Sequence, residues 1–465
     1  MIQRSGAPLR TVWLMGVKTR LLGNIRGAVA DLIEPGGSVL DVCSGTAVVG
    51  RSLAGEYRVI ANDVQAFAST LARAHLVGGV QWRDALEYLD PEEDLDEAFN
   101  ANLQALTALV AEPLSTETEL LPKVVAQLRG EGASTTAEAC SAVDDYRQLL
   151  EHSPRPGETD RATGSIYEGT QPLFSGFLDE RRVQPGRKPF GLCTLYFQNT
   201  YFGLQQSLVL DSMRAAIASI PASDPFQEQK QDLYLAALVY AASVSTSGTS
   251  HFAQPVSARR DPELLRVAKR RCISIEDEFH IALDGIRREW GERDGGFEHR
   301  VTRGAAEEVL AADGVLGDDQ VDLVYLDPPY TADNYSRFYH VLETLVNYDY
   351  PQFELHRGKI TRGLYPVQEA RFRSDFCRAG KVEGAFRRIA EVAAERGAKL
   401  LVSYAEENGL LFKHWVRQGE TQPRARFRQL FRDYFDVVEI RDKSLLHSGQ
   451  GDSNRPTMEL LTLCE

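Results

Sequence analysis

Apolar and polar positions near the start of the chain follow the order of an open α/β sheet. A helical pattern at 18–32 ends in a Pro-Gly-Gly turn, and an apolar run follows at 38–42. A second apolar run at 57–62 ends in Asp63 and precedes a helical pattern at 67–76. This order of strand, glycine turn, helix, strand and acid predicts the opening of a doubly wound α/β sheet.

Strand patterns return only in the last third of the chain. These later apolar runs lie at 321–326, 399–403, 437–440 and 458–463. The stretch before them contains helical patterns, with apolar residues three and four positions apart, at 208–220 and 229–243. We therefore expect a split α/β domain, residues 1–85 and 301–465, with an inserted helical region at 86–300.

The inserted region opens with an acidic stretch. Ten acids and no Lys or Arg occur between Glu87 and Glu119. A run of this kind is typical of a solvated helical face, and we expect one here.

Composition and charge exclude several classes of protein. The chain has 465 residues, with 52 Lys and Arg against 66 Asp and Glu, and this net charge of −14 excludes a protein that coats nucleic acid by bulk positive charge. No stretch has the roughly 18 consecutive apolar residues of a membrane helix, and the N-terminus lacks a secretory pattern. The six cysteines are scattered without zinc-binding spacing. We expect a cytoplasmic protein with no membrane partner and no metal.

The most specific string is Asp327-Pro328-Pro329-Tyr330, which follows the apolar run at 321–326 directly. Open α/β sheets build their sites at the carboxyl ends of strands. Methylating the exocyclic amine of a base requires orienting a weak nucleophile, and Asp327 and the Pro328 carbonyl can accept hydrogen bonds from that amine. The prolines stiffen the turn, and Tyr330 offers a ring on which a flipped base can stack. These four residues are the predicted catalytic residues; a proline turn with a buried Tyr is the structural alternative.

A glycine turn follows the apolar run at 38–42. A strand that runs into such a turn and then a helix lets the backbone approach a ligand closely, and the helix N-terminus adds donors. Asp63 lies about twenty residues after Asp41, where an acid meets ribose hydroxyls in nucleotide-type sites. A purely structural turn is the alternative. The predicted cofactor-binding residues here are Asp41, Cys43, Ser44, Gly45, Thr46 and Asp63.

Near the N-terminus, Trp13, Gly16 and Lys18 place a glycine and a cation close to an aromatic ring. Such a group could cover the carboxylate end of a cofactor, although a Gly-x-Lys string is often only the start of a helix. We include all three among the predicted cofactor-binding residues.

Taken in order, these elements resemble the α-type, D12-class DNA adenine-N6 methyltransferases of the restriction-modification kind. That family orders its motifs as an N-terminal Gly-Lys element, a Gly-rich loop, a target-recognition insertion and then Asp-Pro-Pro-Tyr. Further strings similar to the family are Ile60–Gln65, Tyr330–Thr344, Lys399–Leu410 and parts of the insertion at 208–220 and 247–255. The resemblance implies a Rossmann-like seven-stranded methyltransferase sheet, with a large, mainly helical, inserted target-recognition region.

The resemblance also implies S-adenosylmethionine as the cofactor. By position, Gly16 and Lys18 would contact its methionine end, the loop 41–47 would wrap it, and Asp63 would bind its ribose. Asp327 to Tyr330 would hold the target amine.

The chain departs from the family pattern at three places. Cys43 replaces an aromatic residue of the loop, Ala47 replaces its second glycine, and Arg303-Gly304-Ala305-Ala306 lacks a strand-turn acid. Losing the ring removes packing on the cofactor, and Ala47 adds a methyl group where backbone approach is tight.

Basic residues gather locally despite the acidic total. Six Lys and Arg face two acids between Arg259 and Arg271, and seven face two acids between Arg357 and Lys381. Such clusters can bind phosphates and position a duplex, although solvated helix and loop faces are the alternative. The DNA-binding candidates are Arg259, Arg260, Lys269, Arg270, Arg357, Lys359 and Arg362.

The leading hypothesis is a site-specific enzyme that flips an adenine from double-stranded DNA. It would transfer a methyl group from S-adenosylmethionine to N6 by direct in-line displacement, without a catalytic cysteine, and a cognate restriction or defence protein is a candidate partner. The alternatives are cytosine-N4 methylation, which is the same chemistry on another amine, and a non-catalytic DNA-binding or cofactor-sensing subunit of a defence system.

Overall fold

The protein consists of two compact units, each assembled from separate stretches of the chain. Unit 1 contains Met1–Trp13, Asp84–Arg288 and Arg337–Arg371, and unit 2 contains Leu14–Arg83, Glu289–Ser336 and Phe372–Glu465. The computed structural model describes residues 12, 18–77, 89–130, 137–170, 173–249, 251–291, 296–311, 316–317, 319–446 and 456–465.

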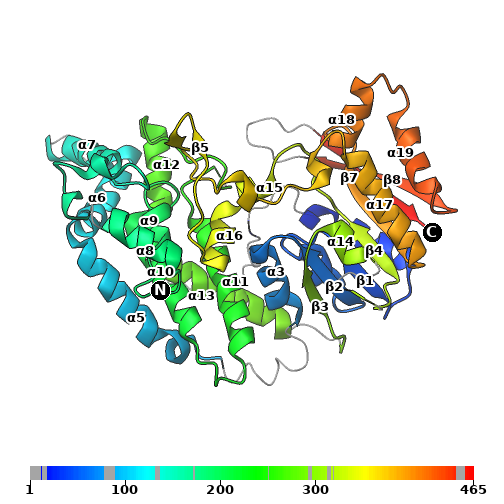
Figure 1. Cartoon of the computed structure of the whole chain (residues 1–465), viewed down its shortest axis with the longest axis horizontal. Helices are drawn as coiled ribbons and strands as arrows, with labels where there is room; N and C mark the ends of the chain where they lie inside the picture. Colours follow the sequence, from blue (N-terminus) through cyan, green and yellow to red (C-terminus); the bar gives the residue numbers. More distant parts are fainter. Residues whose placement is uncertain are drawn as a thin grey trace. The chain divides into compact units, whose positions relative to one another are not determined.

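Unit 2 is built on a seven-stranded sheet with the strand order β3-β2-β1-β4-β7-β9-β8 (Figure 1). The strands are β1 (Ser38–Asp41), β2 (Arg58–Asp63), β3 (Arg300–Arg303), β4 (Leu323–Leu326), β7 (Lys399–Ala405), β8 (Val438–Leu446) and β9 (Pro456–Cys464). The first five strands in this order pair in parallel, and β9 runs antiparallel between β7 and β8. The sheet is therefore mainly parallel, and the carboxyl ends of β1, β2, β4 and β7 meet at one edge.

Helices cover both faces of this sheet, which is why its central strands β1 and β4 are buried along their length and largely apolar. One face packs against the 3-10 turn η1 (Lys18–Leu21), α1 (Leu22–Leu32) and α2 (Val48–Leu53). The other face packs against α14 (Ala306–Leu310), α17 (Val382–Glu395), α18 (Leu410–Arg417) and α19 (Pro423–Arg432). Further elements of unit 2 are α3 (Ala66–Ala72), the π turn η2 (Arg73–Val77) and η8 (Asp375–Cys377), and α15 (Tyr335–Phe338) begins in unit 2 and continues into unit 1.

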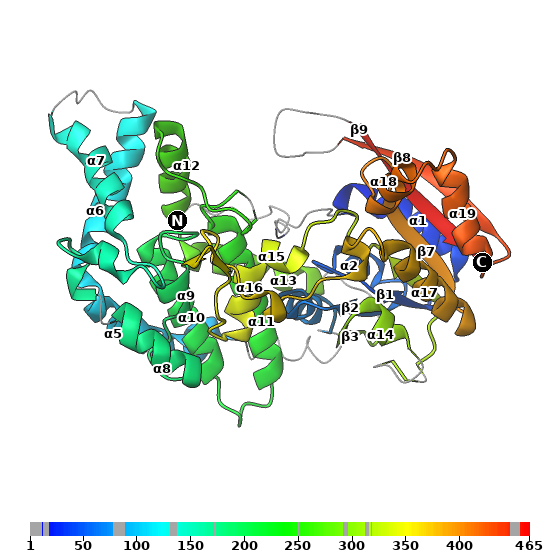
Figure 2. The same cartoon turned by 45° about the horizontal axis from the view of Figure 1, so that its top comes forward.

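Unit 1 is mainly helical. Its α-helices are α5 (Pro91–Leu109), α6 (Ala111–Arg129), α7 (Ala137–His152), α8 (Leu178–Val183), α9 (Leu192–Tyr196), α10 (Leu204–Ser219), α11 (Gln227–Ser245), α12 (Asp261–Arg271) and α16 (His340–Asn347), and α13 (Ile275–Gly291) continues into unit 2. The shorter elements are η4 (Thr159–Ala162), η5 (Glu168–Thr170), η6 (Leu173–Phe177), η7 (Gln368–Ala370) and the ribbon of β5 (Leu355–His356) and β6 (Lys359–Ile360). α10 and α11 bury most of their residues and form the centre of the unit. Figure 2 shows α6, α7 and α12 side by side.

The acidic stretch forms α5 and the first half of α6, and most of its described acids are exposed as expected. α5 begins where it does because Asp90 accepts the N–H groups of Glu92 and Glu93, and Pro91 occupies the first turn. Glu117 on α6 departs from the pattern, since it is 1% exposed.

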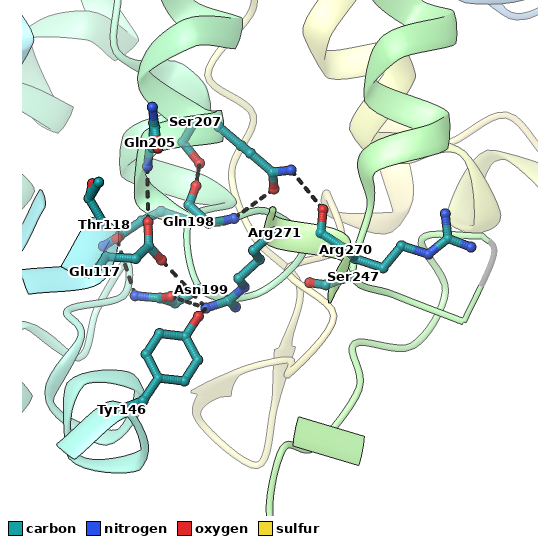
Figure 3. Close-up of polar contacts among 12 residues, drawn as sticks. Glu117, Thr118, Tyr146, Gln198, Asn199, Gln205, Ser207, Ser247, Arg270 and Arg271 are labelled. Carbon is teal, nitrogen blue, oxygen red and sulfur yellow. Dashed lines mark hydrogen bonds and ion pairs between the residues drawn. The ribbon is translucent and has the colours of Figure 1, made fainter. Parts of the chain in front are cut away.

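Glu117 belongs to a buried polar network that joins four helices (Figure 3). Its carboxylate lies 3.8 Å from Arg271 on α12 and accepts the N–H of Gln205, in the first turn of α10, at 3.1 Å. Arg271 also donates to the Tyr146 hydroxyl at 3.0 Å and to Oδ1 of Asn199 at 2.6 Å. The network ties α6, α7 and α12 to the start of α10.

The mixed α/β class and the seven-stranded sheet agree with the expectation from the sequence. β3 is the strand that the apolar runs do not predict, because it is short, has Arg at both ends and pairs only with β2 at the edge of the sheet. Unit 1 extends beyond the expected insertion at 86–300, since it includes Arg337–Arg371. In that segment α16 packs against α11, which explains why it belongs with the helical unit.

Candidate active site

Carboxyl groups gather at the edge of the unit 2 sheet where its parallel strands end. Asp41 is the last residue of β1, Asp63 is the last residue of β2, and Asp327 directly follows β4. β9 runs the opposite way, so Glu459, near its start, pairs with Ala405 at the end of β7 and reaches the same edge. Four carboxyl groups thus share the edge at which open α/β sheets build ligand sites.

The ammonium of Lys18, at the start of η1, lies between two of these carboxylates. Its Nζ is 2.9 Å from Oδ1 of Asp327 and 2.9 Å from Oε1 of Glu459, and its side chain is 5% exposed. Oγ of Ser403 on β7 donates to the same Oε1 at 2.7 Å. Strand alternation directs Ser403 and Glu459 to the sheet face that α1 covers, and Lys18 lies in the turn that leads into α1. The three segments therefore meet on one face of the sheet.

These buried charges shift one another's pKa values. Burial raises the pKa of Asp327 to about 6; Lys18 lowers this pKa and Glu459 raises it. Burial alone would lower the pKa of Lys18, but the carboxylates of Asp327 and Glu459 outweigh burial and raise it above its ordinary value. Lys18 therefore stays positively charged at neutral pH, and Asp327 is negatively charged above about pH 6.

The segment after β7 holds the Asp-Pro-Pro-Tyr turn in place. The carbonyl of Tyr330 accepts the N–H of Leu410 at 2.7 Å. Gly409 makes this approach possible, because a Cβ there would collide with the ring of Tyr404 and with a backbone carbonyl. The turn is thus fixed both by its prolines and by a neighbouring loop.

The side chains of this turn differ in exposure. Asp327 is 18% exposed, which leaves part of its carboxylate open to a ligand. The ring of Tyr330 is 9% exposed and lies in the hydrophobic core, with Nζ of Lys18 5.5 Å from its centre. Because so little of the ring is open, base stacking on Tyr330 stays a prediction.

The loop between β1 and α2 combines left-handed backbone with polar groups that lack partners. Gly45 and Ala47 have φ values of +52° and +56°, in the region that favours glycine. The N–H of Gly45 donates to Oδ2 of Asp63 at 3.0 Å, which ties the loop to β2. Oδ1 of Asp41 and Oγ of Ser44 are buried with no hydrogen-bond partner among the described residues. A polar ligand at this loop would supply the missing partners.

Cys43 and Thr46 lie on the same loop, and Thr46 is buried. Burial and the carboxylates of Asp63 and Asp41 raise the pKa of the Cys43 thiol well above its ordinary value. The thiol is therefore protonated at neutral pH and is a poor nucleophile. Burial, Asp327 and Asp63 likewise raise the pKa of Asp41 well above its ordinary value.

The N-terminal element can be placed only in part. Trp13 and Gly16 lie outside the residues that the structure describes. Lys18 is described, and its contacts are to Asp327 and Glu459.

The first group of DNA-binding candidates lies around α12 in unit 1. Arg259, Arg260 and Lys269 are exposed, whereas Arg270 is half-buried and donates to a carbonyl of α11 at 2.7 Å. Arg271, at the end of the same basic cluster, is buried in the network with Glu117 and is not available to DNA. Counting charges along the sequence therefore overestimates the number of cations that this cluster offers to DNA.

The second group lies on the β5–β6 ribbon and, for Arg362, just after β6, also in unit 1. Arg357, Lys359 and Arg362 are exposed and form no ion pair within the described part of the chain. Arg357 and Gly358 have φ values of +51° and +76°, as in the tightest hairpin turns. The ribbon thus presents several cations on a short, sharply turned hairpin.

Glu459 and Ser403 are the residues of this site that the sequence did not single out. A signal was present, because Glu459 is an acid inside the otherwise apolar run at 458–463. A charged side chain within a buried strand needs a partner, but the sequence does not reveal which one.

Neither a metal cluster nor a membrane-spanning helix occurs among the described residues. No three or more His, Cys, Asp or Glu side chains within the described ranges are arranged to hold a metal ion. In the same ranges, every helix is too short or too polar to cross a membrane.

Comparison with known proteins gives two partial matches. Residues 303–363, which include the Asp-Pro-Pro-Tyr turn, match the family of D12 class N6 adenine-specific DNA methyltransferases. The type II methyltransferase M.FokI of Planomicrobium okeanokoites is 41% identical over 90 residues, which are 19% of this chain and 12% of that protein. The chain thus spans 12% of the length of this curated relative. These matches confirm the resemblance to the D12 class.

Proposed function

From the D12-class match at residues 303–363, we propose that this protein is a DNA methyltransferase that transfers a methyl group to N6 of adenine. The observation that carries the proposal is the position of Asp327. It follows the central strand β4, lies inside the matched segment, and has one carboxylate oxygen held by Lys18. This arrangement leaves the other oxygen for a substrate amine.

The loop after β1 suits S-adenosylmethionine as the methyl donor. When bound, this cofactor supplies a methyl group made electrophilic by the positive charge on its sulfur. The partnerless oxygens of Asp41 and Ser44 fit its polar groups, and the acidic edge favours a cation. Asp63 is placed to accept ribose hydroxyls while it holds the N–H of Gly45. The further proposed contacts of this loop are Cys43 and Thr46.

Lys18 can serve the cofactor and Asp327 together. An ammonium has three donors, and the contacts to Asp327 and Glu459 use two of them. The third is available to a carboxylate at the methionine end, where we also place Trp13 and Gly16.

Asp327 orients the target amine. Oδ2 of Asp327 and the carbonyl of Pro328 accept the two N–H bonds, so that the nitrogen lone pair points along the line of displacement. Pro329 fixes the backbone, and Tyr330 borders the base. The displacement is direct, so the protonated thiol of Cys43 has no role in it.

DNA binding is proposed for unit 1, and the target base leaves the duplex to reach Asp327. Exposed cations bind phosphates and set the position of the duplex without reading its sequence. The proposed phosphate contacts are Arg259, Arg260, Lys269, Arg357, Lys359 and Arg362. Arg270 is half-buried, and only the exposed part of its side chain is proposed to contact phosphate.

A non-catalytic DNA-binding subunit is the second candidate function. It is favoured by Cys43 and Ala47, which stand where the family has an aromatic residue and a glycine. Ala47 nevertheless adopts the left-handed conformation that a glycine would adopt, so the loop keeps its path.

The proposal is tested in a bacterial host whose DNA contains no methyladenine. The protein and its Asp327→Ala variant are expressed separately, and methylated bases in the genome are located by single-molecule sequencing. We expect N6-methyladenine at one recurring sequence with the unaltered protein and none with the variant. N4-methylcytosine at such a sequence would favour the cytosine alternative. An unmodified genome beside folded, DNA-binding protein would contradict the proposal and favour the non-catalytic one.

A further inference from the structure

Glu459 places a second carboxylate on the ammonium that contacts Asp327. Both carboxylates lie 2.9 Å from Nζ of Lys18, and Glu459 is 4% exposed. Glu459 also accepts a hydrogen bond from the hydroxyl of Ser403, which carries no charge. One ammonium therefore faces two carboxylates, of which that of Glu459 is buried and that of Asp327 is partly exposed.

Placing two carboxylates against one buried ammonium costs more free energy than a purely structural ion pair would. A buried cation is balanced by a single carboxylate, and each additional buried charge loses its hydration. The surroundings do not relieve the excess, since the carboxyl groups of Asp41 and Asp63 lie at the same edge and the negative charge of Asp327 raises the pKa of Asp41. The other groups that face this cluster are Cys43, Tyr325, Tyr330 and, opposite Glu459 in the register of β8 and β9, Lys443.

We propose that Glu459 is a positioning residue for the methyl transfer, which divides the ammonium of Lys18 between two carboxylates. Lys18 then orients Asp327 through Oδ1 without neutralising it. Oδ2 keeps the negative charge with which it accepts the hydrogen bond of the target amine. This inference rests on the proposed function, because it assigns Glu459 a part in that same reaction.

The substitution Glu459→Gln isolates the charge of this residue. The amide retains an oxygen that can accept hydrogen bonds from Lys18 and Ser403, but it no longer shares the positive charge. Lys18 then acts on Asp327 alone. Because Glu459 raises the pKa of Asp327 in the intact site, the substitution lowers it, and Asp327 becomes a weaker acceptor.

The test measures kcat, KM and the pH profile of methyl transfer to DNA. For Glu459→Gln we expect a roughly tenfold lower kcat, nearly unchanged KM for DNA and S-adenosylmethionine, and an acid limb displaced to lower pH. Ser403→Ala keeps both charges, so its acid limb should stay in place while kcat falls less. The matched control is Glu439→Gln on β8, where the same change removes an exposed carboxylate that pairs with Arg441. It should leave the profile unaltered.

The outcomes separate the two proposals. If the unaltered protein transfers methyl groups and Glu459→Gln retains its kcat and its acid limb, the inference about Glu459 is overturned and the proposed function stands. If the unaltered protein transfers none, the proposed function fails and the inference fails with it.

A second variant covers loss of folding. If thermal melting shows that Glu459→Gln is unfolded, Glu459→Asp is used instead. Aspartate keeps the negative charge, but its side chain is one methylene shorter, so the carboxylate lies farther from Lys18. An intermediate loss of kcat supports the inference, and kcat equal to that of the unaltered protein contradicts it.

Discussion

Lys18 sets the charge state of the residue that we propose to be catalytic. Its ammonium lowers the pKa of Asp327, whereas burial and Glu459 raise it to about 6. The ionised carboxylate is a much stronger acceptor of the amine's hydrogen bond than the protonated carboxyl group. Activity should therefore persist above this pKa and decline as the pH falls through it.

We predict that kcat for methyl transfer falls about tenfold per pH unit below about pH 6. In Lys18→Met the ammonium that lowers this pKa is gone, so the acid limb should move to higher pH and kcat at neutral pH should drop. The measurement is kcat against pH under saturating substrates, with the exposed Lys413→Met on α18 as the control. An acid limb that did not move in Lys18→Met would show that Asp327 is not the titrating group.

Gly409 lies at a position that has no room for a side chain. Gly409→Ala would push a methyl group into the ring of Tyr404 and a backbone carbonyl. We predict a loss of about 1–3 kcal/mol in the free energy of unfolding, typical of overpacking, together with reduced kcat, because Leu410 next to it holds the Tyr330 carbonyl. Denaturant unfolding measures the first effect. Gly380→Ala, where a Cβ meets no atom, is the control and should be close to neutral.

Single residues could be predicted from the sequence where the chemistry resides in a local string. Asp327, Asp41 and Asp63 each end or follow an apolar run, and the structure places all three at one edge of the sheet. The contacts of Lys18 with Asp327 and Glu459 could not be predicted, because they join segments hundreds of residues apart. Only the order of strands in the sheet brings these segments together.

Elements could be predicted where burial gives the sequence a pattern. Strands covered on both faces read as apolar runs, and β1, β2, β4, β7, β8 and β9 all occur at the predicted places. β3 lies at the sheet edge with Arg at both ends, so its pattern is too short and too polar. The acidic helices show a second limit of prediction. Their acids predict an exposed face, but the sequence does not reveal that Glu117 is buried and lies near Arg271.

The buried pair of Glu117 and Arg271 should support the helical unit. Arg271→Met leaves Glu117 buried without its ion partner, and we predict a loss of about 3–5 kcal/mol in unfolding free energy. Burial raises the pKa of Glu117 and Arg271 lowers it, so in the variant the pKa is higher still. Protonated Glu117 is less costly to bury, and the loss should therefore shrink as the pH falls.

Thermal and denaturant unfolding at several pH values test this prediction. The double variant Glu117→Gln with Arg271→Met should recover much of the lost stability, because no buried charge remains. A loss independent of pH and equal in the single and double variants would mean that packing, not charge, explains it.

The net charge of the whole molecule does not indicate its candidate nucleic-acid-binding surfaces. The chain has a net charge of −14, yet unit 1 carries exposed cations around α12 and on the β5–β6 ribbon. Counting charges along the sequence finds both places, but it includes Arg271, which is buried. The inclusion of Arg337–Arg371 in unit 1 could not be predicted either, since it depends on how α16 packs and not on composition.

The ribbon cations should contribute to DNA affinity in a salt-dependent way. We predict that the triple variant Arg357→Ala, Lys359→Ala, Arg362→Ala binds duplex DNA more weakly and with a shallower dependence of log affinity on log salt. The slope should fall by roughly 0.9 for each phosphate that the variant no longer neutralises. Fluorescence anisotropy over a salt series measures it, with Lys123→Ala on the acidic face of α6 as the control. An unchanged slope would remove the ribbon from the DNA surface.

The central claim is that Asp327, held by Lys18 at the end of β4, directs methyl transfer to the N6 amine of adenine in DNA. The most direct test incubates the purified protein with duplex DNA and S-adenosylmethionine and analyses the nucleosides by mass spectrometry, beside the Asp327→Ala variant. We expect N6-methyldeoxyadenosine from the unaltered protein and none from the variant. No methylated nucleoside from folded protein that binds both DNA and cofactor, or equal yields from the two proteins, would contradict the claim.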